Sequence, residues 1–101
     1  MADLYTVNKS PFEKNSLESV IKFSTAGSAV LLIEDGVYGA TKGTTAESMV
    51  TGASDIKFYV LASDLKARGI SGDRIIDGIE SIDYAGFVDL AVANDKVQAW
   101  L

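Results

Sequence analysis

The apolar run Ala29-Val30-Leu31-Leu32-Ile33 decides the fold class of this chain. The run has the length of a strand and shows no alternation of apolar and polar residues, so both of its faces should be covered. Strands of this kind are typical of parallel sheets that carry helices on each side. The sequence Glu34-Asp35-Gly36 follows and predicts a turn. We therefore expect residues 29–33 to form a strand inside an α/β sheet.

Strand and helix patterns alternate on both sides of this run. The predicted strands are residues 4–7, 56–61, 79–83 and 96–101, and the predicted helices are residues 11–24, 37–41, 45–50, 64–68 and 84–93. This alternation predicts one α/β domain over residues 1–101, with a parallel sheet, flanking helices and right-handed crossovers.

Two serines are predicted to begin helices. In Ser10-Pro11-Phe12-Glu13, the Ser10 hydroxyl and the Glu13 carboxylate can each satisfy a free backbone N–H of the first turn. Pro11 suits the first helical position because its missing N–H costs nothing there. Ser63 is predicted to cap the short helix at residues 64–68.

Apolar spacing predicts which side of each long helix faces the core. In the first helix the inward stripe is Leu17, Val20 and Ile21. The last helix is expected to place four apolar residues on one face, with Tyr84 in the core: Tyr84, Phe87, Val88 and Ala91.

The composition excludes several kinds of chemistry. The 101 residues include no cysteine and no histidine, so the chain cannot carry sulfur as a persulfide, use an imidazole base or build an ordinary zinc site. A net charge of −5 and scattered basic residues argue against nucleic acid or an anionic membrane as the main partner. No phosphate-binding glycine motif, EF-hand spacing or membrane-length apolar run of ~18 residues occurs. We expect no cofactor and no metal.

Ligand sites of parallel α/β sheets lie in loops beyond the carboxyl ends of the strands. In this chain those loops carry five polar candidates for binding a small anionic or polar molecule: Lys9, Ser10, Glu34, Asp35 and Asp64. Helix capping is the alternative role for Ser10, and turn formation is the alternative for Asp35. A hydrolase in which Lys9 activates Ser10 is a further alternative, because a serine nucleophile needs a nearby base.

Large apolar side chains near predicted loop edges suggest a protein interface. Phe12 and Tyr38 lie at such edges, and Trp100 and Leu101 close the sequence. Aromatic side chains are enriched at protein–protein contacts. Completion of the core is the alternative role for Trp100.

Five segments, taken in order, resemble the TusB/DsrH family of sulfur-relay proteins. They are YTVNKSPFEKNSLESVIKFS (5–24), LLIEDGVYGA (31–40), KFYVLASDLKARGI (57–70), IDYAGFVDLAV (82–92) and VQAWL (97–101). Each segment alone is a soft motif, whereas five in order over nearly the whole chain are specific. The opening segment is more similar to members from sulfur-oxidising bacteria than to the enteric members that serve tRNA thiolation.

The resemblance implies a small Rossmann-like fold, shared with DsrE/TusD-like and DsrF/TusC-like partners. It also implies a cytoplasmic heterohexamer, with two copies of each subunit, that passes persulfide sulfur in dissimilatory sulfur oxidation or tRNA 2-thiouridine synthesis. The main sulfur-carrying cysteine of such complexes sits on the DsrE-like subunit.

Some DsrH members have a further cysteine where Val20 stands in this chain. Because Val20 cannot form a persulfide, the resemblance implies a non-catalytic subunit. Lys9, Lys66 and Arg68 could then lower the pKa of a partner's thiol, provided that they lie close to it. The alternative is a stand-alone α/β module that binds a small anionic or polar ligand.

Overall fold

The computed structural model describes residues 3–12, 15–24, 26–94 and 96–100. Five strands form one sheet in the order β4-β3-β2-β1-β5, and every neighbouring pair is parallel. The strands are β1 (Asp3–Val7), β2 (Ala29–Leu32), β3 (Lys57–Leu61), β4 (Glu80–Ile82) and β5 (Lys96–Trp100). The predicted parallel α/β sheet is confirmed.

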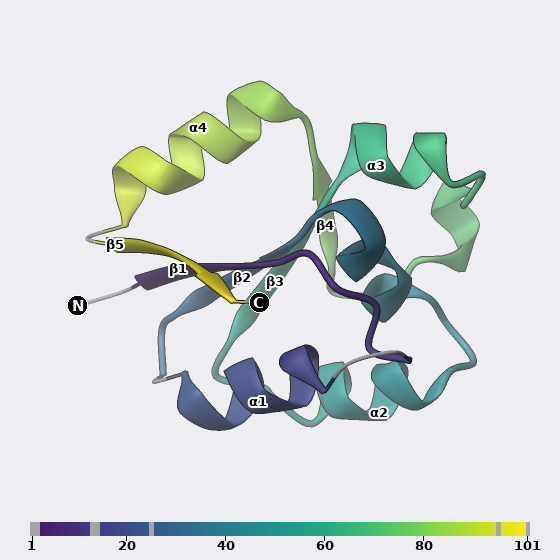
Figure 1. Cartoon of the computed structure of the whole chain (residues 1–101), viewed down its shortest axis with the longest axis horizontal. Coiled ribbons are helices and arrows are strands. Elements are labelled where there is room, and N and C mark those ends of the chain that lie inside the picture. The colour runs from purple at the N-terminus through teal and green to yellow at the C-terminus, as the bar shows by residue number, and fades with distance from the viewer. Residues whose placement is uncertain (1–2, 13–14, 25, 95, 101) are drawn as a thin grey trace.

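Helices lie on both faces of the sheet, as Figure 1 shows. The helices α1 (Ser16–Phe23) and α2 (Thr45–Thr51) run along one face, and α4 (Tyr84–Ala93) lies over the opposite face. Three short helices lie toward the carboxyl ends of the strands: α3 (Ala62–Ala67) and the 3-10 helices η1 (Glu34–Ala40) and η2 (Gly72–Arg74). Within the described ranges, no helix has the length and apolar character needed to cross a membrane.

The middle strand of the sheet is β2, and all four of its residues are buried. Val30 pairs with Tyr5 of β1 on one side and with Phe58 of β3 on the other. Successive side chains of a strand point to opposite faces, so an unbroken apolar run is needed where both faces are covered. The position predicted for residues 29–33 is therefore confirmed.

Two apolar clusters lie on opposite faces of the sheet. The larger one, on the α1 and α2 face, includes Leu17 and Val20, which are 1% and 0% exposed. This burial confirms the inward stripe predicted for the first helix. The smaller cluster, on the α4 face, has Leu4, Ala29 and Leu31 as its buried members.

Both predicted helix caps are wrong. The first helix begins at Ser16, not at Pro11, and the Ser10 hydroxyl accepts a hydrogen bond from the Phe12 N–H at 3.2 Å, which closes a local turn. Glu13, the other half of the predicted cap, lies outside the described residues. The helix α3 begins at Ala62, directly after β3, so Ser63 lies inside its first turn rather than ahead of it.

The predicted core face of the last helix is wrong in two positions. Tyr84 and Val88 are each 61% exposed, although both were expected to point inward. The helix turns Phe87, Leu90 and Ala91 toward the sheet instead. Apolar residues occur on every side of α4, so spacing alone could not select the inward side.

Candidate functional site

The carboxyl ends of β1 and β2 meet at a close backbone contact. The Ile33 N–H donates to the Val7 carbonyl at 3.0 Å, and Glu34 then adopts a left-handed φ of 49°. A Cβ at Gly36 would overlap the Val7 carbonyl, so this position requires glycine. The chain can therefore turn from β2 into η1 directly beside the end of β1.

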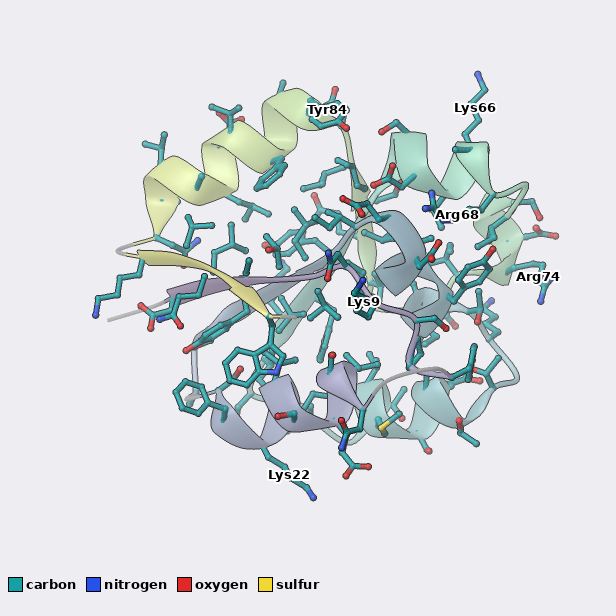
Figure 2. All side chains as sticks on the ribbon, in the orientation of Figure 1. Lys9, Lys22, Lys66, Arg68, Arg74 and Tyr84 are labelled. Carbon is teal, nitrogen blue, oxygen red and sulfur yellow. The ribbon has the colours of Figure 1, made fainter. Side chains whose placement is uncertain are left out.

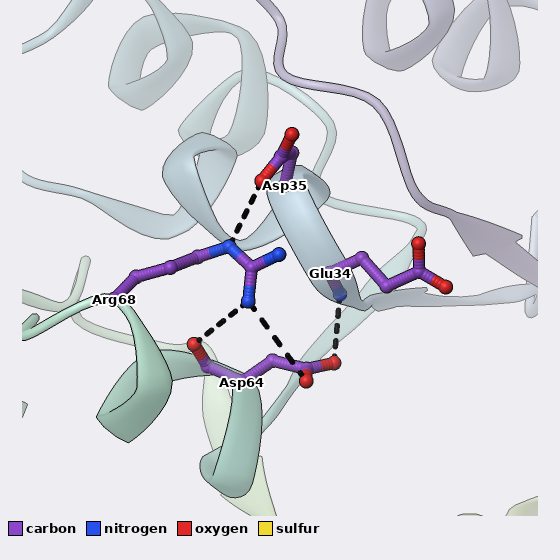
Figure 3. A network of polar contacts seen from close by, with 4 residues as sticks. All are labelled: Glu34, Asp35, Asp64 and Arg68. Carbon is purple, nitrogen blue, oxygen red and sulfur yellow. Dashed lines mark hydrogen bonds and ion pairs between the residues drawn. The ribbon is translucent and has the colours of Figure 1, made fainter.

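A polar network joins the start of η1 to α3, as Figure 3 shows. The Glu34 N–H donates to Asp64 Oδ2 at 2.7 Å, and Arg68 Nε donates to Asp35 Oδ1 at 2.9 Å. Arg68 Nη1 also donates to the Asp64 carbonyl at 3.3 Å and lies 4.0 Å from Asp64 Oδ1. The structure thus brings together three of the five predicted residues at the strand ends.

Arg68 links this network, and it was missing from the predicted strand-end set. It lies four residues after Asp64, so one turn of helix places both side chains on the same side of α3. This four-residue spacing was the signal in the sequence from which the contact between Arg68 and Asp64 could have been predicted. The Arg68 side chain is 23% exposed, and its guanidinium already faces two carboxylates, so its positive charge is largely compensated within the chain. This pairing weakens the expectation that Arg68 lowers the pKa of a partner's thiol.

The other two predicted residues do not join the network. Ser10 is buried, and its hydroxyl already accepts the Phe12 N–H. The Lys9 side chain is exposed, and within the described ranges it forms no ion pair. These positions do not favour the Lys9–Ser10 hydrolase, because no contact between the two side chains activates the serine.

Asn8 lies in the same predicted strand-end loop as Lys9 and Ser10, beside the five candidates. Its Oδ1 is buried and accepts no hydrogen bond from any described residue. Such an acceptor costs about 1–3 kcal/mol when it is left without a donor. Its position directly after β1 was the signal in the sequence, since the loops beyond strand ends carry polar sites.

The strand-end residues are poorly suited to a metal or a phosphate. Among the described residues, no group of three or more acidic side chains lies close enough together to hold a metal ion. Glu34 and Asp35 occupy the first turn of η1. Their negative charges oppose the binding of an anion to the backbone N–H groups there. The arrangement ties η1 to α3 and offers no activated nucleophile.

The predicted interface residues lie in different surroundings. Phe12 is 55% exposed, whereas Tyr38 is half-buried in η1, and Leu101 lies outside the described residues. Trp100 is half-buried against the larger cluster, and its ring lies 5.8 Å from that of Tyr5 and 5.0 Å from that of Phe23. Trp100 therefore contributes to the core, and its use as a contact for another protein stays a prediction.

Comparison with known proteins gives a consistent result. Residues 9–97 match the family model described as DsrH like protein. The chain is 37% identical over 97 residues to Protein TusB of Escherichia coli O81 (strain ED1a), which covers 96% of this chain and 99% of that protein. It is 36% identical to Protein TusB of Erwinia tasmaniensis and 33% identical to that of Photorhabdus laumondii, with the same coverage.

Solved structures agree with the fold. The ychN protein from E. coli has a TM-score of 0.79 at 22% identity, with 98% of this chain and 99% of that chain covered. A protein of unknown function, MTH1491 from Methanobacterium thermoautotrophicum, has a TM-score of 0.76 at 12% identity, with coverage of 96% and 97%. At these identities the likeness concerns the fold alone.

Proposed function

This chain belongs to the DsrH-like family, and from that membership we propose that it is a non-catalytic subunit of a sulfur-relay complex. The complex passes persulfide sulfur between proteins, and its other subunits are DsrE/TusD-like and DsrF/TusC-like. The observation that carries the proposal is the full-length similarity to TusB proteins in a chain that has no cysteine. Without a thiol, the chain cannot take up sulfur itself.

The environment of Val20 supports a structural role. Val20 is 0% exposed on the inner side of α1 and packs in the larger cluster. A sulfur-transfer residue must reach a partner's thiol, so this position serves packing rather than exchange. The subunit's contribution is its shape and its contact surfaces, and the reactive cysteine belongs to a partner.

We also propose a cellular setting, which the family membership supports. We place the complex in the cytoplasm, as a heterohexamer with two copies of each subunit. It serves either tRNA 2-thiouridine synthesis or dissimilatory sulfur oxidation.

Co-expression with DsrE- and DsrF-like proteins from the same source tests the proposal. We expect size-exclusion chromatography and native mass spectrometry to find one complex that contains two copies of each chain. Incubation with a persulfide-carrying partner should leave the mass of this chain unchanged, because no thiol accepts the sulfur. A chain that elutes alone would contradict the proposal and favour the stand-alone ligand-binding module, for which ligand-dependent thermal stabilisation is the readout.

A further inference from the structure

The helix α4 is apolar on every side, yet none of its residues is buried. Asp89 is its one charged residue. A helix that is apolar all round is normally enclosed by protein on all sides. In the isolated chain, the sheet covers one side of α4, through Phe87, Leu90 and Ala91, and these three residues are only partly buried. The remaining apolar sides of α4 have no cover within the described part of the chain.

The uncovered residues of α4 form a stripe. Tyr84, Val88 and Val92 recur every four residues, so they lie on one side of the helix, and they are 61%, 61% and 81% exposed. Figure 2 shows Tyr84 on the outside of the first turn. Val97 of β5 is 47% exposed and pairs with Leu4, so it points to the same face of the sheet as α4. We name Tyr84, Val88, Val92 and Val97 the α4 surface.

The opposite flank of α4 shows which way this stripe points. Gly86, Asp89 and Ala93 line a hollow with Tyr59 and Glu80, so this flank faces β3 and β4. The stripe lies on a different side of α4 from that flank, and it points toward the part of the sheet where β1 and β5 lie. This direction brings the stripe and Val97 onto one side of the molecule.

The charged residues next to the α4 stripe are mostly acidic. Asp83 lies directly before α4 and Asp89 lies within it, and both are exposed. Lys96 of β5 is next to Val97, at the other end of the α4 surface. Asp83 and Asp89 form no ion pair with any residue that the structure describes.

We propose that the α4 surface docks a paralogous α/β subunit of the sulfur-relay complex, through an apolar patch on that subunit rimmed by lysine or arginine. The proposal rests on the proposed function and names the face and the partner chemistry. An apolar centre with charges of opposite sign at its rim is the arrangement that gives an interface both affinity and specificity.

Three variants test the surface in the complex with the DsrE- and DsrF-like partners. We expect Val88→Asp to weaken binding of this chain at least about tenfold, since it places a charge in the apolar centre. Asp89→Lys should also weaken binding and reduce its sensitivity to salt, since it removes a rim charge of the required sign. Ser19→Asp is the matched control, because it adds the same charge to an exposed position of α1 on the opposite face. Its affinity should stay within about twofold of the wild type.

Each outcome bears on a different claim. Thermal unfolding of each variant verifies that it is folded. We expect all three variants to fold, because the substituted positions are exposed. Wild-type affinity in both Val88→Asp and Asp89→Lys would overturn the α4 surface and leave the proposed function intact. The isolated wild-type chain could also form a dimer that Val88→Asp dissociates. That result would show that the α4 surface binds a second copy of this chain, and it would overturn the proposal. A wild-type chain that binds neither partner would overturn the proposed function together with the surface.

Discussion

The two faces of the sheet are closed to different degrees. On one face, α1 buries Leu17 and Val20 and exposes an ion pair between Glu18 and Lys22 at 3.2 Å. On the other face, α4 buries no residue and exposes an apolar stripe in place of charged side chains. Both helices lie against the same sheet, so the difference belongs to the helices and not to the strands (Figure 1).

This difference indicates that the two helices have different roles, one in the stability of the isolated domain and the other in contact with another protein. An amphipathic helix such as α1 supplies stability to the isolated domain, because Leu17 and Val20 on its inner side are buried in the larger cluster. An apolar helix such as α4 contributes little further stability until another protein covers it. The following substitutions measure how far the separation holds.

The largest expected difference concerns thiol reactivity. The natural chain has no cysteine, so Val20→Cys and Val88→Cys each introduce a single thiol. Val20 is 0% exposed and Val88 is 61% exposed. The first thiol reacts only when the structure opens, so we expect Ellman's reagent to modify it roughly a thousandfold or more slowly. Similar modification rates in the two variants would contradict the difference between the two faces. Mild denaturant should make the two rates equal, because it opens the structure around residue 20.

The second largest expected difference concerns the truncation of apolar side chains on the two faces of the sheet. Leu17→Ala should lower the free energy of unfolding by about 2–5 kcal/mol, since Leu17 is 1% exposed in the larger cluster. Leu90→Ala on the partly buried side of α4 should lower it by only about 1 kcal/mol. Urea unfolding of both variants measures the two losses. An equal loss at Leu90 would show that the α4 face is as well packed as the other.

The polar network between η1 and α3, at the carboxyl ends of the strands, should matter less than the core. Arg68→Ala removes the contacts to Asp35 and Asp64, and we expect it to lower the free energy of unfolding by about 1 kcal/mol, because Asp35 is largely exposed. Lys66→Ala on the same helix is the control. Its side chain is exposed, so its effect should stay within about 0.5 kcal/mol. A larger loss for Lys66→Ala than for Arg68→Ala would show that the network does not fasten α3 to η1.

The sheet could be predicted from the sequence because its signals are local and strong. The run at residues 29–33 needs cover on both faces, and the structure places β2 in the middle of the sheet. The inward stripe of α1 was also predictable, since polar residues such as Glu18 and Lys22 mark its outer side. The start of α1 was not, because the turn at Ser10 satisfies the same serine hydroxyl in another way.

The candidate site was predictable only in part. Carboxylates after β2 and at the start of α3 could be placed at one edge of the sheet by topology alone. The pairing of Arg68 with Asp35 depends on how α3 packs against η1, across 33 residues of sequence. The exposure of Tyr84 and Val88 could not be read from the spacing of α4, because that helix carries no polar side to orient it.

The smallest expected effect lies in the loop between α3 and β4, which belongs to neither face. The Ser71 hydroxyl donates to Asp73 Oδ1 at 2.5 Å, and this hydrogen bond is the main reason that the pKa of Asp73 lies below its ordinary value of 3.8. A lowered carboxyl pKa stabilises the folded chain above pH 3.8, and this contribution is lost as the pH falls through the folded-state pKa.

Ser71→Ala tests this contribution. The pKa of Asp73 should rise toward its ordinary value, and the stability of the variant should depend less on pH in the acid range. Carboxyl-carbon NMR titration measures the pKa directly. The control is Ser48→Ala on α2, where the hydroxyl donates to a backbone carbonyl and not to Asp73. An unchanged Asp73 pKa in Ser71→Ala would mean that the other causes that lower it, which are its backbone hydrogen bond and the charges of Lys42 and Arg74, are sufficient.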